Sequence, residues 1–164
     1  MNRWIALVLV TLPARLLADA ALPPNTPPVE VLTMSREGCY GSCPIYRVTV
    51  WSDGRVDYEG KDFVQTKGKR SAKLDGAALT RIRDEFATAK YLTLADKYDR
   101  YDCTDMPTVV TSFREGATRK SVSHYYGDRH APRALFALEK AIDEITGVNA
   151  WVGARGGPMG FTCH

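Results

Sequence analysis

The side chains in this sequence with the clearest capacity for chemistry are four cysteines: Cys39, Cys43, Cys103 and Cys163. Three residues separate the first two, so their thiols can react with each other or bind one ion together. In an oxidising compartment such a pair forms a structural disulfide. When reduced, thiolates act as redox nucleophiles or as ligands for soft metal ions. The compartment therefore decides which chemistry applies.

The N-terminus predicts export. Arg3 supplies a positive charge, an apolar run follows over residues 4–12, and small residues stand at Ala18 and Ala20. This order is typical of a secretory signal peptide. The apolar run is far shorter than the roughly 20 residues that cross a membrane as a helix. We expect cleavage after Ala20, a periplasmic or secreted protein, and no membrane span after cleavage.

The sequence predicts four parts. They are a signal peptide over residues 1–20, a proline-rich linker over 21–28, a single domain over 29–152 and a C-terminal tail over 153–164. A domain of this length can bury an ordinary core. The whole chain carries 22 basic and 19 acidic side chains. This near balance argues against nucleic-acid binding, which depends on a strong positive field.

Alternating side chains predict an N-terminal strand meander. Residues 29–36 are β-like, and residues 45–51 alternate between apolar and polar side chains. A three-residue turn from Ser52 to Gly54 would place Val50 opposite Val56, so that apolar residues share one face. Gly54 would then take the left-handed conformation that this turn needs. Residues 67–70, with three basic side chains, are interpreted as a solvated turn.

Two helices and a hairpin complete the expected fold. Asp75 is a plausible N-cap for a helix with a three- and four-residue apolar spacing. Residues 109–113 and 117–124 predict a hairpin, and a second helix follows Pro132 and ends at Gly147. This order of strand meander, helix, hairpin and helix predicts an α+β class, with a mainly antiparallel sheet and two helices packed on it.

Cysteine pairing has three possibilities in a chain with four cysteines. Gly41 permits a tight turn between Cys39 and Cys43, and Pro44 fixes the chain as it enters the next strand. We favour a Cys39–Cys43 disulfide together with Cys103–Cys163.

Two other uses of the Cys39/Cys43 pair stay open. A thioredoxin-like redox site has one residue fewer between its thiols and a helix after them, whereas a strand is expected here. The Cys-x-x-x-Cys-Pro motif is similar to the metal motif of Sco-type copper chaperones. In that case His124, His130 or His164 would supply a third ligand, and the set considered for a metal is Cys39, Cys43 and His124.

Aromatic loops supply the candidate binding surface. They lie near Tyr40, over residues 98–105 and over residues 124–126. The 98–105 segment is acidic but lacks the Asp-x-Asp-x-Asp-Gly pattern of a calcium loop. No nucleophile elbow, phosphate loop or dinucleotide fingerprint is recognised. We therefore expect no catalytic residues and no cofactor.

Several residues together resemble a bacterial domain family of unknown function, found mainly in exported or lipid-anchored proteins. The resemblance covers roughly residues 29–146 and depends on a Cys-x-Gly-x-Cys-Pro-x-Tyr signature and the motifs after it: Cys39, Gly41, Cys43, Pro44, Tyr46, Asp53, Gly54, Tyr58, Glu59, Gly60, Asp105 and Pro107. The resemblance implies a small α+β domain with no assigned activity.

The hypothesis that follows is a non-enzymatic module of the cell envelope, stabilised by disulfides, that binds an envelope protein or a small ligand. The alternative is a periplasmic thiol-redox or copper-binding protein that uses Cys39 and Cys43.

Overall fold

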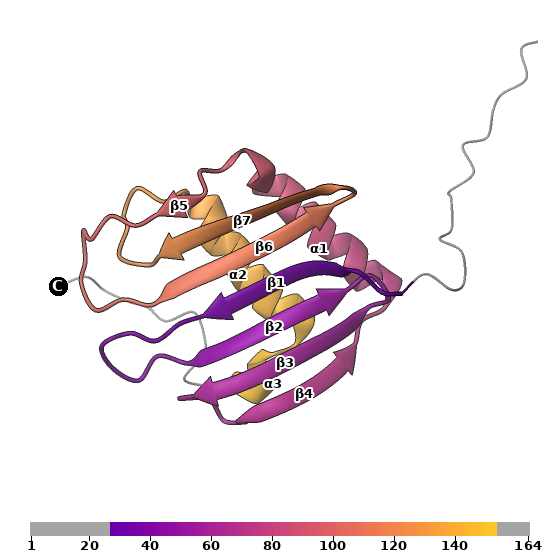
Figure 1. The fold of residues 1–164 in the computed structure, drawn as a ribbon. Helices are drawn as coiled ribbons and strands as arrows, with labels where there is room; N and C mark the ends of the chain where they lie inside the picture. The colour runs from indigo at the N-terminus through magenta and orange to yellow at the C-terminus, as the bar shows by residue number, and fades with distance from the viewer. Residues whose placement is uncertain (1–26, 154–164) are drawn as a thin grey trace, which may run out of the picture.

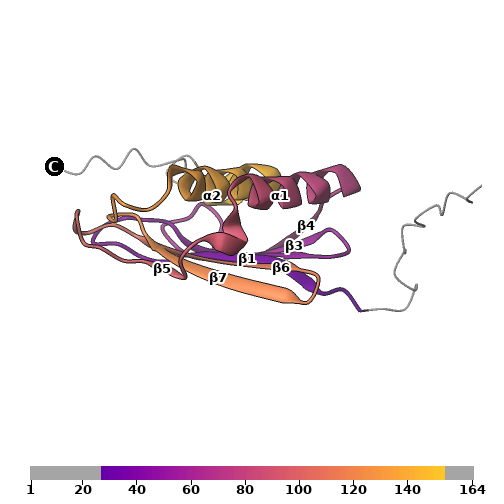
Figure 2. The same cartoon turned by 90° about the horizontal axis from the view of Figure 1, so that it is seen from above.

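The computed structural model describes residues 27–153 of the 164-residue chain. Within this range, one seven-stranded sheet carries its helices on a single face, and no other element of the described residues covers the opposite face (Figures 1 and 2). The elements, in chain order, are β1 (Glu30–Arg36), β2 (Ile45–Trp51), β3 (Arg55–Asp62), β4 (Gly68–Lys73), α1 (Gly76–Thr88), a 3-10 turn η1 (Tyr91–Thr93), β5 (Lys97–Tyr98), β6 (Thr108–Glu115), β7 (Thr118–Tyr125), α2 (Arg133–Thr146) and α3 (Asn149–Val152).

The strand order in the sheet is β4-β3-β2-β1-β6-β7-β5. The β5/β7 pair is parallel and the other pairs are antiparallel. This arrangement confirms the predicted α+β class and its mainly antiparallel sheet. The face under the helices holds the apolar core, because alternate residues of each strand point toward α1 and α2.

The β2–β3 hairpin has the predicted register. Val50 pairs with Val56, and the amide of Gly54 donates to the carbonyl of Trp51 at 2.9 Å. Gly54 has a φ of 87°, and a Cβ at this position would lie 2.5 Å from the carbonyl oxygen of Leu74. Both the conformation and the close approach therefore require glycine here.

The helix ends also follow the sequence signals. The Asp75 side chain accepts from the amide of Ala78 at 2.8 Å and begins α1. Gly147 ends α2 in the left-handed conformation, with a φ of 70°. Ile82 and Phe86 of α1, and Leu135, Leu138 and Ile142 of α2, are buried against the sheet.

The interpretation of residues 67–70 as a solvated turn was wrong, because β4 begins at Gly68 and pairs with β3. This strand lies at the edge of the sheet and most of its side chains are exposed. It therefore lacks the apolar alternation by which a half-buried strand is recognised. The two-residue β5 was likewise not expected, since so short a strand leaves no periodicity.

The predicted signal peptide, most of the proline-rich linker and nearly all of the C-terminal tail lie outside the described residues. Within residues 27–153, no helix combines the length and the apolar character needed to cross a membrane.

Candidate functional site

Three loops meet at one end of the sheet, where four of its strands begin or end. Because β1 and β7 run in the same direction and β2 and β6 in the opposite one, the chain leaves or enters all four strands there. The segments are residues 37–44, 99–107 and 126–132, and we call them together the loop edge (Figure 1, left). The amide of Glu37 donates to the carbonyl of Thr108 at 2.8 Å, which joins the bases of two of these loops.

The 37–44 loop is closed by a disulfide between Cys39 and Cys43, as the sequence predicted, with Cα atoms 5.6 Å apart. Cys43 is buried and Cys39 is half-buried. Tyr40 lies inside this small ring with a side chain that is 88% exposed. The disulfide therefore holds an aromatic side chain out into solvent.

The 99–107 loop is fixed onto the chain after β7. The amide of Cys103 donates to the carbonyl of Gly127 at 3.1 Å, and the Tyr125 hydroxyl donates to the carbonyl of Cys103 at 2.8 Å. A Cβ on Gly127 would lie 2.1 Å from that same carbonyl oxygen, so only glycine permits this approach. Cys103 is also disulfide-bonded. Cys163 lies outside the described residues, so the Cys103–Cys163 pairing stays a prediction.

Two carboxylates hold the loop backbone. Asp128 accepts from the amides of His130 at 2.8 Å and Arg100 at 3.1 Å, and Asp102 accepts from the amide of Arg129 at 3.0 Å. Burial alone would raise the pKa of Asp128, but the two amides outweigh it and lower that pKa below its usual value. The carboxylates thus stabilise the turn after β7.

The candidate metal ligands are arranged differently from the sequence hypothesis. Ligand atoms of Asp102, Asp128 and His130 lie within 4.8 Å of one another, and these residues are the one such group among residues 27–153. Their carboxylates already serve the backbone amides. The sulfurs of Cys39 and Cys43 are bonded to each other, and His124 is fully buried with its Nδ1 3.0 Å from Glu139.

A buried polar network lies beneath the bases of the three loops, between the sheet and α2. The Arg36 guanidinium, at the end of β1, donates to the Tyr46 hydroxyl at 2.8 Å and to the Tyr126 hydroxyl at 2.9 Å. It also forms an ion pair with Asp143 of α2 at 2.8 Å. Tyr46 in turn donates to the same carboxylate at 2.7 Å. Arg36 therefore connects β1, β2, the segment after β7 and α2.

The network continues to a buried glutamate. Arg36 also donates to the backbone carbonyl of Glu139 at 3.4 Å, and the buried side chain of Glu139 contacts Nδ1 of His124 at 3.0 Å. Burial raises the pKa of Asp143, while the positive charge of Arg36 opposes that shift. Burial likewise raises the pKa of Tyr126 well above its ordinary value. Burial raises the pKa of Tyr46 as well, and its protonated hydroxyl donates to Asp143.

Sequence reasoning did not single out Arg36, Glu139 or Asp143. A signal was present, because both acids fall within the apolar stripe of α2. Glu139 directly follows Leu138, and Asp143 directly follows Ile142. Charged residues on the buried face of an amphipathic helix are almost always paired. What the sequence could not supply was the partner, since Arg36 lies 107 residues before Asp143.

The signature residues divide between two ends of the sheet. Tyr46, Asp105 and Pro107 lie at the loop edge, where the amide of Tyr126 donates to the carbonyl of Pro107 at 3.0 Å. Asp53 and Gly54 lie at the opposite end, in the β2–β3 turn, where Asp53 accepts from the amide of Arg55 at 3.0 Å. The structure therefore does not bring the whole signature into one site.

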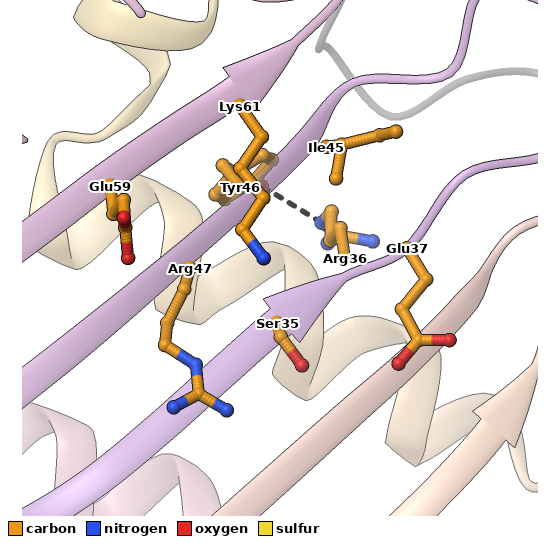
Figure 3. A pocket seen from close by; sticks show the side chains of 8 residues that line it. All are labelled: Ser35, Arg36, Glu37, Ile45, Tyr46, Arg47, Glu59 and Lys61. Carbon is orange, nitrogen blue, oxygen red and sulfur yellow. Dashed lines mark hydrogen bonds between the residues drawn. The ribbon is translucent and has the colours of Figure 1, made fainter. Parts of the chain in front are cut away.

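A shallow pocket of about 370 Å³ adjoins the loop edge on the uncovered face of the sheet. Figure 3 shows its charged side chains, which extend from β1, β2 and β3, with the hydrogen bond between Arg36 and Tyr46 beside them. The pocket and the buried network thus lie close to the same strand ends, on the two faces of the sheet.

A family model described as a Domain of unknown function (DUF6438) matches residues 30–146 of the chain. The chain belongs to this family. No curated protein matches the chain. The DUF6438 family carries no assigned activity, which agrees with the resemblance to a family of unknown function.

Proposed function

We propose that this DUF6438 protein is an exported, non-enzymatic binding module, and that its loop edge binds another protein of the cell envelope. The observation that supports this most directly is the exposure of two tyrosines there. Tyr40 is 88% exposed and Tyr101 is 75% exposed, the two highest values among the large apolar side chains of residues 27–153. Tyrosine is enriched at the centres of protein interfaces because it buries much area at little entropic cost.

Rigid support for these tyrosines strengthens the proposal. Tyr40 lies within the Cys39–Cys43 ring, and the ring of Tyr101 packs against Tyr125 with centroids 4.8 Å apart. Arg36 and its partners fix the strand ends beneath both loops. Side chains that are already held in position lose less conformational entropy when a partner binds.

Export is part of this proposal. It is supported by the signal-like order of residues 1–20 and by the Cys39–Cys43 disulfide, since disulfides persist mainly outside the reducing cytoplasm. Mass measurement of the mature protein from its native cell tests it directly. A chain that begins at Ala21 supports export with cleavage after Ala20, whereas a full-length chain in the cytoplasm with reduced thiols contradicts it.

Site-specific photocrosslinking in the native cell tests the binding surface. A photoreactive phenylalanine analogue would replace Tyr40 or Tyr101, and the matched control would replace Ala117, which is exposed in the β6–β7 turn at the opposite end of the sheet. We expect the same discrete adduct from positions 40 and 101 and none from position 117. Equal labelling at all three positions, or none at any, would contradict the proposal.

A thiol-redox function is the second candidate, because Cys39 is half-buried while Cys43 is buried. This asymmetry suits a pair in which one sulfur is attacked and the other resolves the mixed disulfide. Titration of thiols in protein quenched with acid inside the cell separates the candidates. Fully oxidised Cys39 and Cys43 favour the binding module, and a large reduced fraction favours redox exchange.

A further inference from the structure

The pocket on the uncovered face of the sheet has a chemistry of its own. Paired positions on three strands place Ser35 beside Arg47 and Arg47 beside Glu59, so these side chains form one row across β1, β2 and β3. All three line the pocket, and the helices pack on the other face. The row is therefore open to solvent and to a ligand.

A β-bulge brings a second cation into the pocket. Ile45 pairs with Asp62 and Tyr46 pairs with Gly60, so Lys61 is the extra residue of β3. Bulges re-aim a side chain and often accompany functional sites. Figure 3 shows the Lys61 amine extending over the middle of the pocket, toward the side on which the Arg47 guanidinium lies.

The pocket charges are not paired with each other. Within residues 27–153, none of the four charged side chains that line it at the surface forms an ion pair: Glu37, Arg47, Glu59 and Lys61. Elsewhere on β3, opposite charges do meet, as in the Arg55–Asp57 ion pair. In the view of Figure 3, the two cations lie between the two carboxylates.

We propose that this pocket binds a small zwitterion, a free amino acid or a dipeptide. The ligand carboxylate would accept from Arg47 and Lys61, and the ligand ammonium would donate to Glu37 or Glu59. A volume of about 370 Å³ suits a ligand of that size, because it lies near the lower end of the range for small-molecule sites. A ligand with one charge would leave one pair of pocket charges without a partner.

This site is separate from the protein-binding surface proposed above. It uses the flat face of the sheet rather than the tips of the loops, and its test contains no protein partner. Failure of either proposal therefore leaves the other standing.

Titration by NMR tests the pocket with defined probes. The ¹⁵N-labelled mature protein would be titrated with the standard amino acids and with glycylglycine. Any ligand found would be compared with its N-acetyl form and its C-terminal amide. We expect at least one probe to shift the amides of residues 35, 47, 59 and 61, and each blocked form to bind at least about tenfold more weakly. Equal binding of the N-acetyl form overturns the zwitterion assignment, and so does the absence of any shift at about 10 mM probe.

Matched variants locate the binding. Arg47→Gln and the double variant Glu37→Gln/Glu59→Gln should each weaken binding of the identified probe by about tenfold or more. Lys61→Gln serves as a second cation variant. Lys73→Gln is the control, because Lys73 is exposed and pairs with Asp53 at the other end of the sheet. This variant should bind the probe with unchanged affinity. If the folded Arg47 and Lys61 variants bind as well as the control, the proposal is wrong.

Discussion

The core under α1 and the core under α2 are built from different chemistry. Near α1, Phe86 stacks on Phe113 with ring centroids 3.9 Å apart, and Tyr91 meets Phe86 edge to face at 4.8 Å. Under α2, at the loop edge, Arg36 and Asp143 form a buried ion pair with hydroxyl partners around it. One sheet thus supports an apolar cluster and a charged network.

The apolar cluster mainly contributes stability, whereas the charged network mainly fixes the positions of the elements that it joins. Apolar packing stabilises the fold roughly in proportion to the apolar area that it buries. It tolerates exchange of one apolar side chain for another of similar volume. A buried ion pair gains little net energy, because both charges lose their hydration, but removal of one partner leaves the other charge uncompensated. The network therefore specifies where the ends of β1, β2 and β7 lie, which is what the loop edge requires.

Removal of the network's cation should have the largest effect. Arg36→Met should lower the free energy of unfolding by about 3–5 kcal/mol, since the Asp143 carboxylate would be left buried without its cation and the backbone carbonyl of Glu139 would lose a donor. Urea unfolding with the disulfides intact measures this. In the double variant Arg36→Met/Asp143→Leu, the loss should be well below the sum of the two single losses. A loss under about 1 kcal/mol for Arg36→Met would remove the contrast between the two halves of the core.

Removal of one tyrosine hydroxyl from the charged network and one from the apolar cluster compares the same group in the two surroundings. Tyr46→Phe removes a hydroxyl bonded to two charged groups and should cost roughly 1.5–3 kcal/mol. Tyr91→Phe removes a hydroxyl bonded to one carbonyl, that of Thr111, and should cost roughly 0.5–1.5 kcal/mol. Chemical unfolding of both variants gives the comparison, and equal losses would show that charge adds nothing to the network.

The Cys39–Cys43 disulfide should contribute about 2 kcal/mol, because the ring that it closes is short. The double variant Cys39→Ser/Cys43→Ser measures this contribution in thermal unfolding. Amide exchange should rise over residues 37–44 while α1 keeps its protection. If protection is lost throughout the domain, the loop is integral to the core rather than a support for Tyr40.

The smallest expected effect concerns pH. The pKa of Asp128 is lowered in the folded state, so its contribution is fully present above its unfolded value of about 3.9 and is lost as the pH falls through the folded value. Asp128→Asn should cost about 1 kcal/mol at pH 7, and progressively less as the pH falls below the unfolded value of about 3.9. Unfolding of both proteins at each pH checks this. Asp84→Asn, at an exposed position of α1, is the control, and an identical pH profile there would contradict the assignment.

The sequence by itself determined the local structure. The Asp75 cap, the end of α2 at Gly147 and the turn at Gly54 each follow from residues within a few positions of one another. The five-residue span from Cys39 to Cys43 made that disulfide a local feature as well. In each case a short stretch of chain has few conformations open to it, so composition and spacing suffice.

Tertiary structure decided what the sequence left open. Edge strand β4 has no apolar side to mark it, and the partners of Asp143 and Glu139 come from distant segments of the chain. The pocket likewise needs the register of three strands and one bulge to gather Arg47, Glu59 and Lys61. Pairing between distant segments depends on the packing of the whole sheet, and no local pattern encodes which charge will meet which.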